Sequence, residues 1–142
     1  MPIFSDPTRP APAPWWKHLL AGLLYGVLVA AAFPPASAWP LTLFSLAPLV
    51  WSAFHPGRRP WISALMVALG SLPLWIFQER WLLDVTEIGY PLLALYLCLY
   101  PGVFVWLTSF VSRRLERAGF EIPAALIVPI LWAGLEFLRG EI

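Results

Sequence analysis

The amino-acid sequence predicts an all-α, polytopic membrane protein, a bundle of about five transmembrane helices. Hydrophobic residues make up 60% of the 142 residues and charged residues only 12%, whereas a soluble domain carries roughly twice that charged fraction. A soluble core of this size would need a charged shell that the chain cannot supply, so lipid is the predicted solvent. The net charge is +1 and no basic tract interleaved with aromatics occurs, which argues against nucleic-acid binding.

The N-terminal segment is distinct from the rest of the chain. Residues 1–17 contain five of the sixteen prolines, and proline lacks the amide proton that a helix needs. We therefore expect a proline-rich cytoplasmic tail, followed by a transmembrane helical domain over residues 18–142.

Apolar stretches and the breaks between them define the predicted spans. From His18 to Gly57 the chain has no charged residue over about forty positions, against roughly twenty for one bilayer crossing. Prolines 34, 35 and 40 divide this stretch into a hairpin. Residues 78–89 mix charges with Trp and Leu, as in a segment lying at a membrane surface. The predicted spans are residues 18–33, 40–54, 61–77, 90–111 and 122–138.

The distribution of Lys and Arg predicts the orientation, because basic residues of short loops stay in the cytoplasm. With a cytoplasmic N-terminus and a periplasmic C-terminus, seven of the nine basic residues are cytoplasmic, and only Arg80 and Arg139 lie outside. The seven are Arg9, Lys17, Arg58, Arg59, Arg113, Arg114 and Arg117.

The first span has an alternative interpretation. Lys17, the apolar run and Ala36-Ser37-Ala38 imitate a secretory signal with its small-residue cleavage site. The proline-rich lead is a poor signal start, however, and the later spans need a first partner. We favour a retained span.

Known catalytic and metal-binding motifs are missing from the sequence. There is no phosphate-binding glycine loop, no dinucleotide fingerprint and no histidine pair at metal spacing, so we expect no metal and no cofactor. His18 and His55 lie at predicted cytoplasmic helix ends, where water and lipid headgroups are their expected neighbours. Cys98 lies in an apolar run, where a thiol stays protonated and acts as a small hydrophobe.

Glu136 and Arg139 form the most informative charged pair. They are three residues apart and share one helical face near the outer boundary, and a charge at that depth usually has a partner or a function. One interpretation is a structural ion pair that ends the helix, with Gly140 as its C-cap. The other places the pair beside a polar site outside the membrane.

Four segments stand out by their order and spacing. They are Ala32-Phe33-Pro34-Pro35 with Trp39-Pro40, Leu46-Ala47-Pro48-Leu49, the run LALYLCLYPG at residues 93–102, and Pro129-Ile130-Leu131-Trp132 leading into Glu136-Phe137-Leu138-Arg139-Gly140. Together they resemble the N-terminal membrane domain of apolipoprotein N-acyltransferase, and the resemblance covers residues 19–140.

The resemblance implies a multi-pass enzyme of the bacterial inner membrane that completes lipoprotein maturation. Such an enzyme moves an acyl chain from a phospholipid to the free amino group of a diacylglyceryl-cysteine in apolipoproteins. In the family a periplasmic nitrilase-like domain supplies a Cys nucleophile, a Glu base and a Lys. None of these three positions occurs in the 142 residues, so we interpret the chain as an N-terminal fragment that is inactive alone. Trp81, Glu136 and Arg139 are then expected to form the floor beneath the active site.

Two other functions compete with this interpretation. The chain could be a stand-alone, non-catalytic membrane module that binds lipid or a separate nitrilase-like partner. It could also be a small transporter subunit, but such proteins usually show paired repeats and polar residues lining mid-membrane faces, and the sequence shows neither.

The predicted orientation can be tested with reporter fusions. A reporter that is active only in the periplasm, fused after Ile142, is expected to be active, because the positive-inside distribution places this end outside. Activity of a cytoplasmic reporter alone at the same position would show that the orientation is the reverse.

Overall fold

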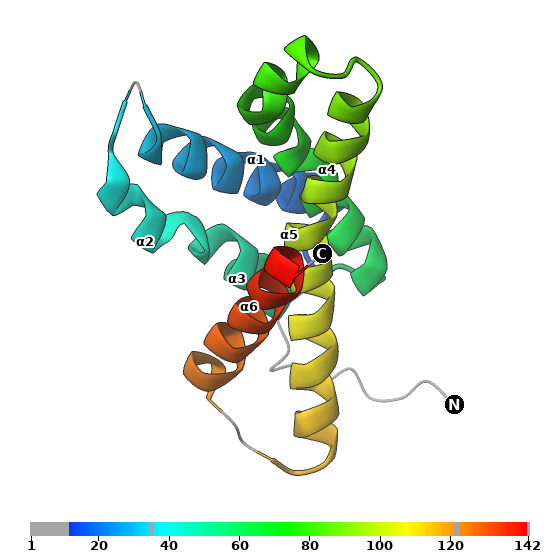
Figure 1. Ribbon diagram of the computed structural model, residues 1–142. Helices are drawn as coiled ribbons and strands as arrows, with labels where there is room; N and C mark the ends of the chain where they lie inside the picture. The colour runs from blue at the N-terminus through cyan, green and yellow to red at the C-terminus, as the bar shows by residue number, and fades with distance from the viewer. Residues whose placement is uncertain (1–11, 35, 121–122, 142) are drawn as a thin grey trace.

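The computed structural model describes residues 12–34, 36–120 and 123–141, and within these ranges every regular element is a helix (Figure 1). The predicted all-α class is therefore confirmed for the described part of the chain. The elements are α1 (Trp15–Ala32), η1 (Trp39–Leu41), α2 (Thr42–Ser45), α3 (Ala47–Phe54), α4 (Pro60–Gln78), η2 (Glu79–Asp84), α5 (Gly89–Arg117) and α6 (Ala124–Glu141).

Three of these helices are long and apolar enough to cross a membrane. They are α1, α4 with its extension η2, and α5. The apolar stretch Trp39–Phe54 is shorter and is divided among η1, α2 and α3, with a proline in the first two positions of both η1 and α3. Helix α6 is 18 residues long but carries three charged residues. The total of five spans and the orientation of the termini remain predictions.

Helix α4 is the centre of the bundle and packs most extensively against α1 and α5. Glycines allow this close approach. A Cβ atom on Gly22 of α1 would lie 2.2 Å from the Val67 carbonyl oxygen of α4, and one on Gly70 of α4 would lie 2.2 Å from the Leu19 carbonyl oxygen. On α5, a Cβ on Gly102 would lie 2.9 Å from the Ala64 carbonyl oxygen. The three backbones thus touch directly, as small residues permit in membrane helices.

The expectation that His18 meets water and headgroups is wrong, because its side chain is fully buried. Its Nδ1 atom lies 2.6 Å from the Ser52 hydroxyl of α3. The turn between α3 and α4 covers it, since Gly57 lies against His18 and donates its N–H to the Ser63 hydroxyl at 2.9 Å. His55 is half-buried, and its Nδ1 lies 3.0 Å from the Trp51 carbonyl oxygen.

The contact between α1 and α4 predicts a large effect of a small substitution. Gly22→Ala places a methyl group where the Val67 carbonyl oxygen lies, and is expected to lower the free energy of unfolding by about 1–3 kcal/mol, as overpacking does. Helix content followed during a denaturant titration in mixed micelles measures this change.

Gly134→Ala is the matched control, because a Cβ at this helical glycine has nothing within 4 Å. It should leave stability unchanged or raise it by up to about 1 kcal/mol through helix propensity. Equal stabilities of the two variants would contradict the direct contact of α1 with α4.

Candidate functional site

A groove of about 560 Å³ opens where α1, α4 and α6 end and α2 begins. We call it the α6 groove. Its charged and amide side chains come from two segments that are far apart in sequence. Gln78 and Glu79 lie at the junction of α4 and η2, and Glu136 and Arg139 lie near the end of α6. The groove therefore gathers side chains that the sequence separates by more than fifty residues.

The predicted pair, Glu136 and Arg139, is joined in the structure. Arg139 Nη2 donates a hydrogen bond to Glu136 Oε2, and each side chain is about one-third exposed, 34% for Glu136 and 35% for Arg139. Helix α6 continues through Gly140 to Glu141, so Gly140 is not the C-cap that one interpretation required. The pair thus lies within a helix, on the wall of the α6 groove.

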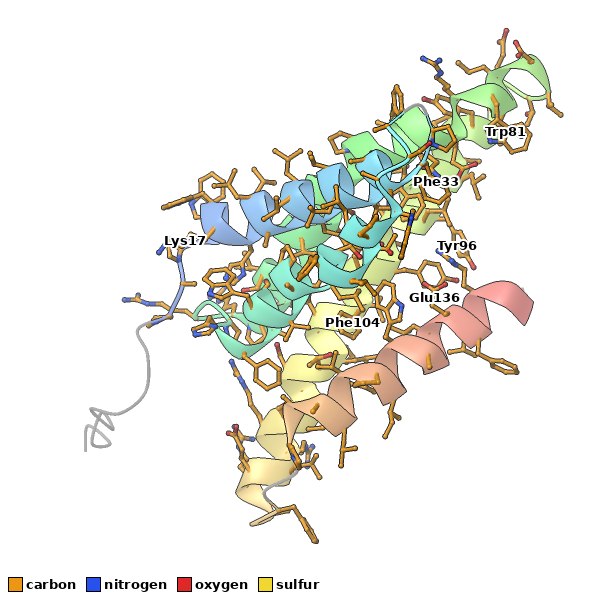
Figure 2. All side chains as sticks on the ribbon, turned by 90° about the vertical axis from the view of Figure 1, so that its left-hand side faces the viewer. Lys17, Phe33, Trp81, Tyr96, Phe104 and Glu136 are labelled. Atoms are coloured by element: carbon orange, nitrogen blue, oxygen red, sulfur yellow. The ribbon has the colours of Figure 1, made fainter. Side chains whose placement is uncertain are left out.

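Trp81, the third predicted residue, lies outside the α6 groove. It is 59% exposed, and Figure 2 shows it near the tip of the bundle, away from Glu136. Its Nε1 atom donates to Glu79 Oε2 at 3.2 Å, and Glu79 lines the groove. Trp81 is therefore bonded to one lining residue of the α6 groove, Glu79, and does not line the groove itself.

Aromatic side chains that the sequence analysis did not select line the same groove. Tyr25 and Trp75 are 5% and 8% exposed, and Trp132 packs edge-on against Tyr25, with ring centroids 6.4 Å apart. The Nε1 atom of Trp75 is buried with no hydrogen-bond partner among the described residues. One signal was available in the sequence, because Trp132 lies four residues before Glu136 and hence on its helical face.

The single thiol of the chain lies away from the α6 groove. Cys98 is buried in α5 and its Sγ donates to the Leu95 carbonyl oxygen at 3.1 Å, which confirms the prediction that it acts as a core side chain. Among the described residues, no group of three or more His, Cys, Asp or Glu side chains could hold a metal ion. The groove therefore offers binding surfaces and a charged pair, and Cys98 is not among its lining residues.

Comparisons with known proteins agree on one family. The family model of the apolipoprotein N-acyltransferase N-terminal domain matches residues 25–142. The apolipoprotein N-acyltransferase of Haemophilus influenzae is 31% identical over 139 residues, which covers 90% of this chain and 24% of that protein. The apolipoprotein N-acyltransferase of Geobacter metallireducens is 30% identical over 142 residues, with coverages of 87% and 24%.

A third apolipoprotein N-acyltransferase, from Nitrosomonas europaea, is 30% identical and is covered to 26% of its length. The chain therefore spans about a quarter of the length of the curated relatives that it matches. No solved structure matches it. Because the family model covers most of the described helices, the chain belongs to the apolipoprotein N-acyltransferase family.

Proposed function

We propose that these 142 residues are the membrane part of an enzyme that transfers an acyl chain from a phospholipid to the N-terminal amino group of diacylglyceryl-cysteine in apolipoproteins. The match to the family's N-terminal domain carries this proposal. The enzyme acts at the bacterial inner membrane, with the N-terminus of the chain in the cytoplasm, and needs no cofactor.

The acyl-accepting nucleophile comes from outside these residues. Acyl transfer through a thioester needs an activated thiolate that can reach the ester carbonyl. Cys98 does not meet this need, because its thiol is buried in α5 and donates to a carbonyl of its own helix. The Cys, Glu and Lys of a nitrilase-like domain supply the chemistry, and the membrane part holds the lipid.

The α6 groove is the proposed place where the lipid substrate is held. An Arg guanidinium presents a planar set of donors that fits a phosphate group, and Arg139 is kept in place by Glu136. Beside this pair, the rings of Tyr25, Trp75 and Trp132 give an apolar wall suited to the glycerol and acyl parts of a phospholipid. Under the predicted orientation the groove faces the periplasm, below the catalytic domain.

Depletion of the gene in its host tests the proposed function. If the protein carries out the last acylation, lipoproteins from depleted cells should keep a free α-amino group, and re-expression should restore the N-acyl chain. Mass spectrometry of lipoprotein N-terminal peptides measures both forms. Full N-acylation in depleted cells would reject the enzyme and favour the alternative of a stand-alone module that binds lipid.

The role of the charged pair can be tested in the same cells. Replacing both residues, Glu136→Ala with Arg139→Ala, should lower the rate of N-acylation roughly tenfold, equivalent to about 1.4 kcal/mol of transition-state stabilisation, because the phosphate loses its guanidinium partner. The rate is followed by pulse labelling at matched membrane levels of protein.

Two further variants serve as controls. Arg80→Ala with Asp84→Ala removes the same two kinds of charge from exposed residues that do not line the α6 groove, and should leave the rate unchanged. The exchanged pair, Glu136→Arg with Arg139→Glu, keeps an ion pair but moves the guanidinium. Full activity of the exchanged pair would show that the pair is only structural.

A further inference from the structure

A second groove runs between α4 and α5 and has one basic and one apolar part. The basic part has a volume of about 200 Å³ and includes Arg113, Arg114 and Arg117. The apolar part has a volume of about 290 Å³ and lies between Ala64 and Ala68 of α4 and Gly102 of α5, among other residues. Trp61 and Trp106 line both parts, so the two parts adjoin. We call the whole feature the α4–α5 groove.

The arginines of the basic part form no ion pair with a carboxylate of the described residues. Within residues 12–34, 36–120 and 123–141, the ion pair of α6 is the only one, so none of the three arginines is paired with a described Asp or Glu. Glu116 belongs to the same turns of α5 but lines a different groove, together with Phe54 and Ile127. Arg114 lies over the Phe110 ring, with Cζ 5.3 Å from its centroid, which holds the guanidinium at the groove.

The apolar part has the shape of a trough. Its bottom is narrow because α5 touches α4 at Gly102. A Cβ added to Gly102 would lie 2.9 Å from the Ala64 carbonyl oxygen and 3.0 Å from the Ala68 Cβ. Larger side chains form the two walls and are exposed. On α4 these are Trp61 and Leu65, and on α5 they are Leu99, Val103 and Trp106.

We propose that the α4–α5 groove binds one anionic phospholipid, with its phosphate on the arginines and one acyl chain in the trough. The positive charge of the arginines complements the negative charge of the lipid phosphate. Along the helices, basic residues are followed by two tryptophans and then by apolar side chains. A membrane leaflet has the same order from headgroup to interior. Zwitterionic lipids match the trough equally well but carry no net charge for the three cations.

The basic part of this site is distant from the α6 groove. Leu97 of α5 lines the α6 groove and Arg113 lines the basic part, and sixteen residues of helix span about 24 Å. Under the predicted orientation the bound lipid belongs to the cytoplasmic leaflet. It is therefore a resident lipid and not the acyl donor. The proposal of this lipid site does not rest on the proposed acyl transfer.

Lipid retention in native mass spectrometry tests the site. The protein, expressed from its own gene, is transferred from nanodiscs that contain equal amounts of phosphatidylglycerol and phosphatidylcholine. We expect one phosphatidylglycerol to be retained in preference to phosphatidylcholine. The variant Arg113→Gln with Arg114→Gln should weaken this binding at least roughly tenfold, since each basic residue contributes to the attraction of anionic lipid.

The matched control removes another adjacent arginine pair that does not line the groove. The variant Arg58→Gln with Arg59→Gln should retain phosphatidylglycerol as the unchanged protein does. Equal losses in both variants, or equal retention of the two lipids, would overturn the proposal in favour of general charge attraction or of another occupant of the groove. Displacement of the lipid by an equal concentration of inorganic phosphate would overturn the role of the trough.

Discussion

Direct contact between the backbones of α1, α4 and α5 is the constraint on which the rest of the structure depends. Lipid tails are as apolar as leucine, so burial of hydrocarbon does not drive these helices together, and close packing must do so. Gly22, Gly70 and Gly102 provide that packing by leaving no side chain at the contact. Helix α4 takes part in both contacts and also contributes to both grooves. Trp61, near its start, lines the α4–α5 groove, and Trp75, near its end, lines the α6 groove.

Buried hydrogen bonds to α1 and α5 position the short helix α3. Helix α3 has eight residues, about 12 Å of helix, and depends on its neighbours. Its Ser52 hydroxyl lies 2.6 Å from His18 of α1, and its Ala53 carbonyl oxygen accepts a bond of 2.7 Å from Ser109 of α5. In a membrane, unpaired polar groups are costly, so these bonds favour a single position for α3.

Features set by neighbours in sequence were predictable, and features set by neighbours in space were not. The helical class and the pairing of Glu136 with Arg139 follow from apolar runs and from a spacing of three on one helical turn. The burial of His18 depends on the turn at Gly57, which comes from a segment about forty residues away. Likewise, Trp75 of α4 and Glu136 of α6 line the same groove, and no local pattern in the sequence contains that information.

The arginine of the α6 groove is paired with a carboxylate, whereas those of the α4–α5 groove are not paired with any described carboxylate. A lipid headgroup is therefore expected to stay bound for longer in the α4–α5 groove. Arg139 is paired with Glu136, so in the proposed substrate site a phosphate would gain only part of the attraction of a free guanidinium and could leave after the reaction. The arginines of the α4–α5 groove have no described carboxylate partner, so an anionic headgroup there meets the full charge. Under the proposed function a substrate is released in every cycle, whereas the lipid proposed for the α4–α5 groove stays bound.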